Sequence, residues 1–340
     1  MPIVLTGLVV IILLFSVVRF HHYLSARNLF LGGKQSVSLF IPTGSDFNSV
    51  KSILYKTGYI RNKNSFEWTA RRMHYGIVIK PGKYKLTDGM SNRELIGMLR
   101  AGRQDPVHLV ISGARTKEDL AGKLGRQLEP DSAKFMQLMK DESFLKRFSL
   151  SPATALALII PNTYDLFWST TPAGFFIRMY RENRPFWKGG REAKADSLGL
   201  SEAEVITLAS IIEKETNHNP EKPMIAGVYI NRLKKGIPLQ ADPTIIYAWN
   251  DFSIRRVLNK HLGIKSPYNT YQKLGLPPGP ICIPSIASID AVLNYVHHSY
   301  LYFCARDDLS GTHNFASTLA EHSRNAKRYQ DALNKLNVRQ

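Results

Sequence analysis

Cysteine is nearly absent from this sequence of 340 residues, which contains only Cys282 and Cys304. Two cysteines cannot build a disulfide framework, and no C-x-x-C spacing indicates a redox or metal centre. The two could bridge each other in an oxidising compartment, but buried free thiols are the expectation. Ligand-spaced histidines are also missing, because His297-His298, His313 and His322 match no metal motif. We therefore expect structural histidines, with no metal and no cofactor.

Acidic residues are scarce relative to basic ones, with 27 Asp and Glu against 45 Lys and Arg and a net charge of +18. This balance favours anionic partners such as lipid headgroups, acidic cell-envelope polymers or nucleic acid. Long basic runs are lacking, however, and nothing exceeds pairs such as Arg71-Arg72. The sequence therefore predicts no nucleic-acid partner.

Charge is missing altogether from residues 2–18, which are dominated by Val, Ile, Leu and Phe. This run is close to the roughly 20 apolar residues that span a bilayer, and it predicts a single membrane anchor over residues 1–24. A cleavable signal peptide fits less well, because no basic residue precedes the run and Leu24-Ser25-Ala26 is a poor cleavage site. Arg19, Arg27 and Lys34 follow the run, and this bias alone would place the bulk of the chain in the cytoplasm.

Short strand, turn and helix patterns fill residues 25–112. Strands are predicted at 37–41, 77–79 and 107–111, each followed by a glycine-containing turn and an amphipathic helix. Ser91 and Glu94 form an S-x-x-E capping box at one helix start. Such units are typical of small α+β modules. Within them, residues 82–102 resemble a LysM-type glycan-binding module, although a plain spacer explains the pattern equally well.

An apolar helix is predicted from Ser201, where Ser201 and Glu204 form a second capping box, to about Thr216. It is apolar on nearly every face, so we expect it to be buried. Glu213 and Glu215 lie at its end and, at about 100° per residue, point in nearly opposite directions.

The two glutamates are therefore expected to differ. Glu213 follows Ile211-Ile212, so we expect partial desolvation, a raised pKa and a role as general acid. Glu215 is expected to be structural and paired with a basic side chain. Two solvated glutamates at a fraying helix end are the alternative.

Two proline-stiffened turns carry the candidate substrate-binding residues. Gln240, Asp242 and Tyr247 lie on the first turn, and Asn269 and Tyr271 lie on the second. Aromatic faces can stack on sugar rings while amides and carboxylates bind hydroxyl groups, so this composition favours a carbohydrate-binding cleft.

Several ordered motifs resemble those of the endolytic murein transglycosylase family (YceG-like). They are Ala209–Thr216, Asn231-Arg232-Leu233, Leu239–Thr244 with Tyr247, Ser266–Tyr271, Gly275–Ile281, His313-Asn314-Phe315 and Glu321-His322. The chain departs from the family pattern at Leu156-Ala157, Asn162 and Ile283.

The resemblance implies a single-pass protein of the cell inner membrane with its enzymatic part outside the cytoplasm, which overrides the charge argument on orientation. It implies cleavage of MurNAc–GlcNAc bonds within peptidoglycan glycan strands, leaving 1,6-anhydroMurNAc ends. The first Glu of the I-E-K-E-T motif, which is catalytic by this resemblance, matches Glu213. One acid suffices when the sugar's own 6-hydroxyl is the nucleophile, because the same Glu acts first as acid and then as base. Peptidoglycan synthases are the implied protein partners.

The predicted architecture is α+β, with an N-terminal transmembrane helix, a small LysM-like module and a larger mixed α/β catalytic domain. The predicted boundaries are 1–24 for the anchor, 25–112 for the module with its linking units, and 113–340 for the catalytic domain. A non-catalytic glycan-binding scaffold that recruits synthases is the alternative function.

Overall fold

The computed structural model describes the backbone of residues 2–335 and the side chains of residues 7, 8 and 10–335. Contacts divide the chain into two compact units. Unit 1 consists of Met1–Leu109, Gln127–Pro130 and Asp165–Thr171; unit 2 consists of Val110–Arg126, Asp131–Tyr164 and Pro172–Gln340. The predicted boundaries at 24/25 and 112/113 stay predictions.

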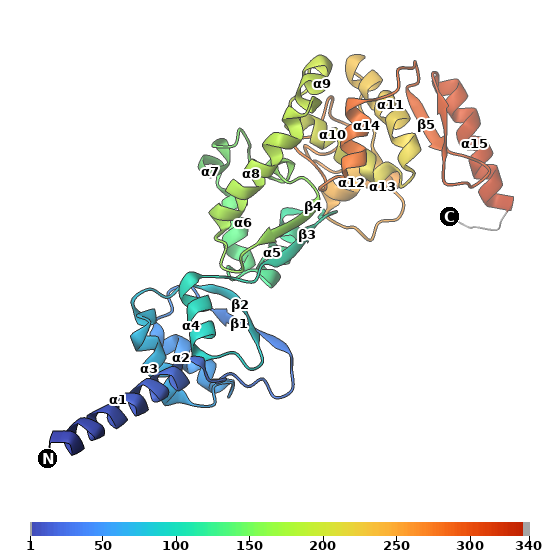
Figure 1. Ribbon diagram of the computed structural model, residues 1–340. Helices are drawn as coiled ribbons and strands as arrows, with labels where there is room; N and C mark the ends of the chain where they lie inside the picture. Colours follow the sequence, from blue (N-terminus) through green and yellow to red (C-terminus); the bar gives the residue numbers. More distant parts are fainter. Residues whose placement is uncertain (1, 336–340) are drawn as a thin grey trace. The chain divides into compact units, whose positions relative to one another are not determined.

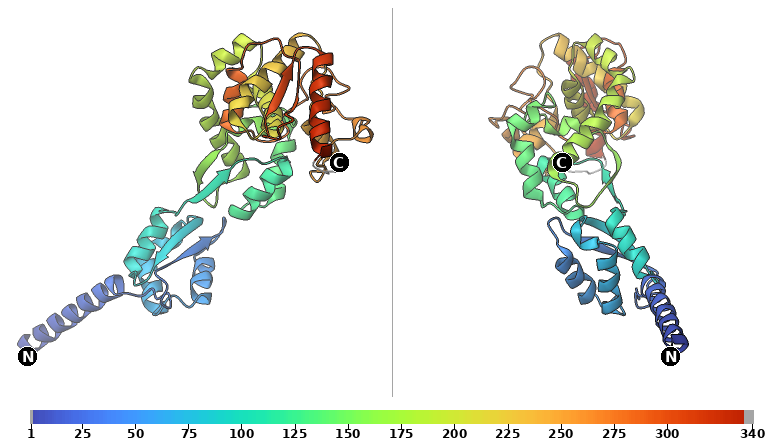
Figure 2. Two further views of the ribbon diagram at one scale, coloured as in Figure 1. Left: turned by 90° about the vertical axis from the view of Figure 1, so that its right-hand side faces the viewer. Right: turned by 60° about the vertical axis from the view of Figure 1, so that its left-hand side comes forward.

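Unit 1 is built on an antiparallel pair of strands, β1 (Ser36–Ile41) and β2 (Gly82–Thr87), in which Ser36 lies opposite Thr87 (Figures 1 and 2). Alternate side chains of both strands are buried against the helices. The remaining elements are α2 (Phe47–Lys56), α3 (Lys63–Arg72), η1 (Tyr75–Ile77) and α4 (Asn92–Ala101). The Ser91–Glu94 capping box at the start of α4 is confirmed.

The strand predicted at 77–79 is wrong. Residues 75–77 form a 3₁₀ turn, and Ile77 is 77% exposed. The pairing partner of β1 begins at Gly82 instead. A short run of β-branched residues forms a strand only where a neighbouring strand pairs with its backbone.

Helix α1 (Pro2–Ser25) precedes the sheet of unit 1, and it contacts α3 and α4 of the same unit. The Thr69 hydroxyl and the Asn92 amide donate to the carbonyl of Tyr23 at 3.1 and 3.0 Å. Phe20 and Tyr23 meet the Trp68 ring edge to face. In the part of the chain searched, which omits the side chains of residues 1–6 and 9, no helix qualifies by length and apolarity as a membrane span.

Unit 2 is mostly helical. It contains an antiparallel sheet of β5 (Tyr302–Ala305) and β6 (His313–Ala316). β3 (Val107–Ile111) pairs with β4 (Asn162–Leu166), and each of these two strands has residues in both units. The helices of unit 2 are α5 (Lys117–Gln127), α6 (Ser132–Lys140), α7 (Glu142–Lys146), η2 (Ala155–Leu158), α8 (Pro172–Lys188), α9 (Arg191–Leu198), α10 (Glu202–Glu215), η3 (Asn219–Glu221), α11 (Lys222–Lys234), α12 (Asp242–Trp249), α13 (Asn259–Leu262), α14 (Ile286–Leu293) and α15 (Leu319–Lys335). The mixed architecture predicted from the sequence is confirmed.

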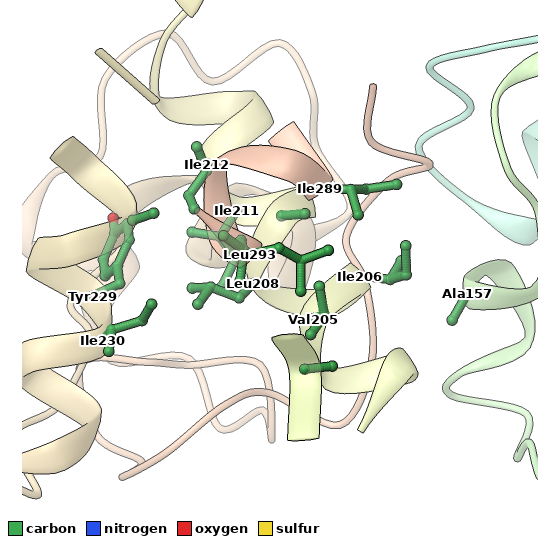
Figure 3. Packing of buried hydrophobic residues seen from close by; sticks show 14 of the residues in the cluster. Ala157, Val205, Ile206, Leu208, Ile211, Ile212, Tyr229, Ile230, Ile289 and Leu293 are labelled. Atoms are coloured by element: carbon green, nitrogen blue, oxygen red, sulfur yellow. The ribbon is translucent and has the colours of Figure 1, made fainter. Parts of the chain in front are cut away.

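Helix α10 is the centre of the unit 2 core (Figure 3). Every residue from Val205 to Ile212 is buried, and α11, α12 and α14 pack around it. Its predicted start is confirmed, because the Ser201 side chain and Glu204 form the capping box. The helix is therefore in the core from Val205 to Ile212 and leaves it at its last turn, where Glu213 and Glu215 lie.

Both cysteines are free thiols. Cys282 is buried, as expected, and burial raises its pKa to about 12. Cys304 lies on β5 and is only partly buried.

Candidate functional site

A cavity of about 380 Å³ opens beside the C-terminal end of α10 in unit 2. Its lining combines a carboxylate pair, a guanidinium, an amide, an imidazole and several aromatic rings. The residues are Glu215, Tyr229, Arg232, Leu239, Gln240, Asp242, Tyr271, Leu301, Tyr302, Phe303, Leu319 and His322. We call this the Glu215 pocket.

Glu215 is the last residue of α10, and it turns away from Glu213. Its Oε1 accepts a hydrogen bond from the hydroxyl of Tyr229 on α11. Tyr229 and Arg232 are three residues apart on α11, so they lie on the same face of that helix and both reach the pocket. The predicted basic partner of Glu215 is wrong, since its partner is a phenol.

The pKa of Glu215 is raised to about 7, mainly because burial disfavours the charged carboxylate. The negative charge of Asp242 raises it further, while the hydrogen bond from Tyr229 opposes the shift. Near neutral pH, a substantial fraction of Glu215 therefore carries a proton and faces a cavity that a ligand can enter.

Asp242 begins α12 at the rim of the pocket, where its side chain meets solvent. Its Oδ1 accepts a hydrogen bond of 2.5 Å from the hydroxyl of Tyr271. Desolvation by the surrounding protein raises the pKa of the Asp242 carboxyl group, and the hydrogen bond from Tyr271 opposes that rise. The pocket thus holds two carboxyl groups, each with a tyrosine donor.

Arg232 organises the floor of the pocket. Its buried guanidinium donates to the carbonyls of Leu301, Pro238 and Leu239, and to Oε1 of Gln240 at 3.0 Å. Gln240 adopts a left-handed φ of 54°, which is uncommon for a side-chain-bearing residue and is held by these contacts. The oxygen of the Gln240 amide is thereby fixed at the lining of the pocket.

His322 and Tyr302 form the wall contributed by the C-terminal segment, with their rings stacked at 5.3 Å. Burial and the positive charge of Arg232 lower the pKa of His322, so the imidazole is neutral at neutral pH. Its Nδ1 is buried and has no hydrogen-bond partner among the described residues.

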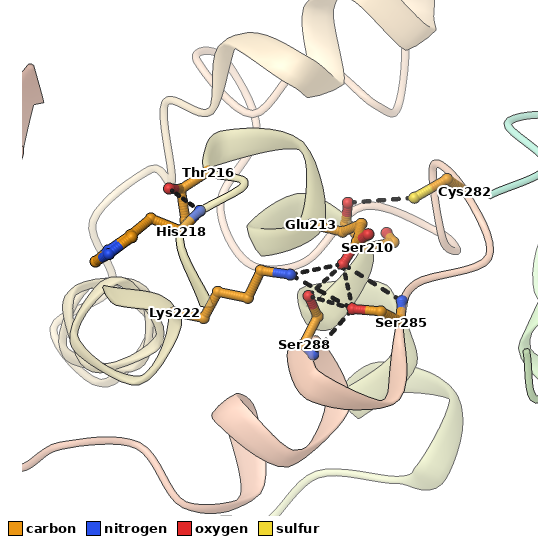
Figure 4. A network of polar contacts seen from close by, with 8 residues as sticks. All are labelled: Ser210, Glu213, Thr216, His218, Lys222, Cys282, Ser285 and Ser288. Carbon is orange, nitrogen blue, oxygen red and sulfur yellow. Dashed lines mark hydrogen bonds and ion pairs between the residues drawn. The ribbon is translucent and has the colours of Figure 1, made fainter. Parts of the chain in front are cut away.

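Glu213 lies outside this pocket, in a separate polar cluster (Figure 4). Its Oε2 accepts from the hydroxyls of Ser285 and Ser288 at 2.6 and 2.5 Å and from the ammonium of Lys222 at 3.0 Å. Burial pulls the pKa of Glu213 upward, but these hydrogen bonds and the charge of Lys222 outweigh it and lower the pKa.

The expected raised pKa of Glu213 is therefore wrong. The apolar residues that precede Glu213 in the sequence predict desolvation of its carboxylate. The partners that α11 and α14 bring to this carboxylate have no local signal in the sequence. The expected divergence of the two glutamates is confirmed, because their hydrogen-bond partners are entirely different.

The five predicted binding residues divide into two groups. Gln240, Asp242 and Tyr271 line the Glu215 pocket, whereas Tyr247 lines a different cavity and packs against Tyr268. Asn269 is 0% exposed, and its amide donates to the carbonyls of Leu262 and Ile264. This burial contradicts a direct substrate contact by Asn269, whose Oδ1 instead accepts from the backbone N–H of Tyr271.

Sequence reasoning missed Tyr229, Tyr302 and Arg232 as pocket residues and treated His322 as structural only. Arg232 belonged to a quoted motif, and the spacing of Tyr229 and Arg232 on one helix face was available as a signal. For Tyr302 and His322 no local signal exists, because they reach the pocket from a distant part of the chain.

The model of the YceG-like family matches residues 39–328 of the chain. The endolytic murein transglycosylase of Bacillus subtilis (strain 168) is 28% identical over 317 residues, which cover 88% of this chain and 87% of that protein. That of Streptococcus pneumoniae serotype 2 (strain D39 / NCTC 7466) is 29% identical over 327 residues. The match covers 86% of this chain, and only 58% of the length of the pneumococcal protein.

The crystal structure of a YceG-like protein from Listeria monocytogenes has a similar fold, with a TM-score of 0.58 and 28% identity. The similarity covers 86% of this chain and 99% of that one.

Proposed function

The chain belongs to the YceG-like family, and from this premise we propose that it is a peptidoglycan lytic transglycosylase with the Glu215 pocket as its active site. The observation that carries the proposal is the carboxyl group of Glu215, with a pKa of about 7, in an open cavity beside fixed polar side chains. The proposal assigns the acid to Glu215 rather than Glu213, because a general acid must be protonated near neutral pH.

In the proposed reaction, protonated Glu215 donates its proton to the glycosidic oxygen between MurNAc and GlcNAc. The bond from this oxygen to C1 of MurNAc breaks, and GlcNAc leaves with a new hydroxyl group. The 6-hydroxyl oxygen of the same MurNAc then attacks C1, and its proton passes to the Glu215 carboxylate. The product is a 1,6-anhydroMurNAc end, the acid is regenerated and no water is consumed.

Other pocket residues stabilise the charges of this reaction. Asp242 is placed to stabilise the positive charge that develops on the sugar ring, because its carboxylate lies in the same cavity. Arg232 holds Gln240, and Tyr271 holds Asp242, so the two substrate-binding groups are preorganised before the sugar arrives. Binding of substrate by Gln240, Asp242 and Tyr271 is part of the proposal.

The decisive experiment is mass spectrometry of purified glycan strands incubated with the full-length protein and with Glu215→Gln and Glu213→Gln. We expect internal cuts ending in 1,6-anhydro sugars, lost in Glu215→Gln and retained in Glu213→Gln. Reducing ends would instead indicate a hydrolase with Asp242 as second carboxylate. Strand binding without cleavage would support the scaffold function, and loss only in Glu213→Gln would refute the assignment of the acid.

The proposal includes a membrane anchor at α1 with the catalytic unit outside the cytoplasm. Support comes from the apolar side chains of residues 10–18 on this helix, which are exposed and need a nonpolar environment. Resistance of the protein to extraction by alkaline carbonate, with unit 2 accessible to protease added outside the cytoplasmic membrane, would be the expected result. Release into the soluble fraction would contradict the anchor.

Glycan binding by unit 1, as a LysM-like module, is also proposed. Its support is two exposed aromatic side chains of unit 1, Phe40, whose ring meets that of Trp168 at 5.0 Å, and Phe167. Aromatic faces of this kind stack on sugar rings. Sedimentation with insoluble peptidoglycan should weaken in Phe167→Ser. Partnership with peptidoglycan synthases is proposed on the family resemblance alone and is testable by crosslinking in cells.

A further inference from the structure

A second cavity, of about 140 Å³, lies in unit 2 and is less than half the size of the Glu215 pocket. The two cavities use neighbouring residues of the same helices. On α10, Glu215 lines the first and Lys214 the second; on α12, Asp242 lines the first and Pro243 and Tyr247 line the second. The two cavities therefore flank the end of α10 and the start of α12.

The lining of the second cavity is basic. Arg115 and Lys214 supply its charges, and no carboxylate is among the lining residues. Within residues 7, 8 and 10–335, neither cation has an ion-pair partner. Asp119 accepts from the backbone N–H groups of Arg115 and Thr116 rather than from the Arg115 guanidinium, and the exposed Glu118 is not among the lining residues. Two unpaired cations in a concave site attract an anionic group.

The rest of the lining is apolar and aromatic. The guanidinium of Arg115 lies 4.9 Å from the centre of the Phe252 ring, and Tyr247 packs against Tyr268 at 4.7 Å. Ile254 and Ile281 complete the apolar side. The contact with Phe252 holds the guanidinium next to the apolar side, where it can bind a carboxylate that lies beside a short apolar group.

We propose that this cavity binds the peptide stem carried by the MurNAc residue, taking a stem carboxylate on Arg115 and Lys214 and a short side chain against Phe252 and Tyr247. The inference rests on the proposed function, because a glycan strand in the Glu215 pocket would place its peptide branch near the neighbouring cavity. The site would make the enzyme distinguish strands that carry stems from strands that have lost them.

The test compares two substrates with the full-length protein: strands with intact stems, and the same strands after an amidase has removed the stems. The readout is the ratio of kcat/KM for stem-bearing over stripped strands. Wild-type protein should favour stem-bearing strands, and Arg115→Gln should lower the ratio on the order of tenfold, the effect of one charge-assisted hydrogen bond, mainly through KM. Arg115→Lys should restore part of it, which a folding defect would not allow.

Arg255→Gln is the matched control, because Arg255 is an exposed cation in the same loop as Phe252 that lines neither cavity. Its ratio should equal that of the wild type. A ratio unchanged in Arg115→Gln, or lowered equally in Arg255→Gln, would overturn the proposal.

Titration calorimetry with the isolated stem peptide separates this inference from the proposed function. Binding that weakens on the order of tenfold in Arg115→Gln supports the cavity even if no strand is cleaved. Cleavage of both strands with no Arg115-dependent binding of the peptide would overturn the cavity proposal while leaving the transglycosylase function intact.

Discussion

Glu213 and Glu215 are two residues apart at the end of one helix, yet they differ in nearly every physical property. Glu213 lies against Lys222, Ser285 and Ser288, and its pKa is lowered. Glu215 lies in a cavity with a tyrosine as its hydrogen-bond partner, and its pKa is raised to about 7. Two serine hydroxyls and a lysine ammonium stabilise the carboxylate of Glu213, whereas burial without a cationic partner destabilises that of Glu215.

The comparison shows that apolar neighbours in the sequence do not set the pKa of a carboxyl group. Both glutamates leave the same dry helix, and burial raises the pKa of each. The net pKa shift depends on which helices each carboxylate faces. Glu213 faces α14 and the first residue of α11, whereas Glu215 faces the middle of α11 and the start of α12.

Substitution of the two glutamates should differ most in its effect on activity. Glu215→Gln removes the transferable proton and should lower kcat by roughly 10²- to 10⁴-fold, the usual contribution of a general acid–base. Glu213→Gln should lower it by less than about tenfold, because the proposed mechanism gives Glu213 no part in the proton transfer. Quantification of anhydro ends under saturating substrate measures both. Equal losses in the two variants would abolish the functional distinction.

Stability should change in opposite directions and in different pH windows. The raised pKa of Glu215 means that the folded protein binds this proton more tightly than the unfolded chain. The free energy of unfolding therefore falls as pH rises from about 4.5 to about 7. Glu215→Gln removes that penalty, so it should stabilise unit 2 by roughly 3 kcal/mol at pH 8 and have little effect at pH 4.

Glu213 has the opposite sign. Its lowered pKa means that it contributes stability above its ordinary value of 4.5, and this contribution is lost as pH falls through the folded-state pKa. Glu213→Gln leaves the Lys222 ammonium, only 3% exposed, without its carboxylate, so it should cost about 1–3 kcal/mol at pH 7 and less in acid. Urea unfolding of both variants from pH 3 to 8 measures these two changes in the free energy of unfolding. A change of the same sign in both variants at pH 8 would refute the predicted difference.

Only substitutions around Glu215 should change the pH dependence of activity. Because Glu215 must be protonated, kcat/KM should fall as pH rises through about 7. Asp242→Asn removes a like charge and should move this fall to lower pH, whereas Tyr229→Phe removes a hydrogen bond to the carboxylate and should move it to higher pH.

Ser288→Ala is the matched control for these profiles. It removes the hydrogen bond that the Ser288 hydroxyl donates to Glu213, which raises the pKa of Glu213. Ser288 does not line the Glu215 pocket. The rate profile of this variant should match that of the wild type, and its stability should fall by about 1 kcal/mol. A shifted profile in Ser288→Ala would mean that the two carboxyl groups are coupled.

Much of the fold followed from local pattern. The capping boxes at Ser91 and Ser201 set two helix starts, and the unbroken apolar run of α10 predicted its burial. The strand expected at 77–79 failed because strand formation depends on a partner, and β1 pairs with residues 82–87. Gln240, Asp242 and Tyr271 were chosen because polar groups on proline-stiffened turns are typical of binding sites, and the structure brings all three to the Glu215 pocket. Their binding of substrate stays a prediction.

The sequence by itself determined the family, the buried helix and the placement of two carboxyl groups on opposite sides of its end, because helical periodicity and ordered motifs are properties of the chain. Only the tertiary structure decided which carboxyl group holds a proton near neutral pH. Lys222, Ser285 and Ser288 surround Glu213, while Tyr229, Asp242 and His322 meet around Glu215. These partners lie 9 to 107 residues away in the chain from the glutamate that each of them faces, and electrostatic energies depend on distances in space.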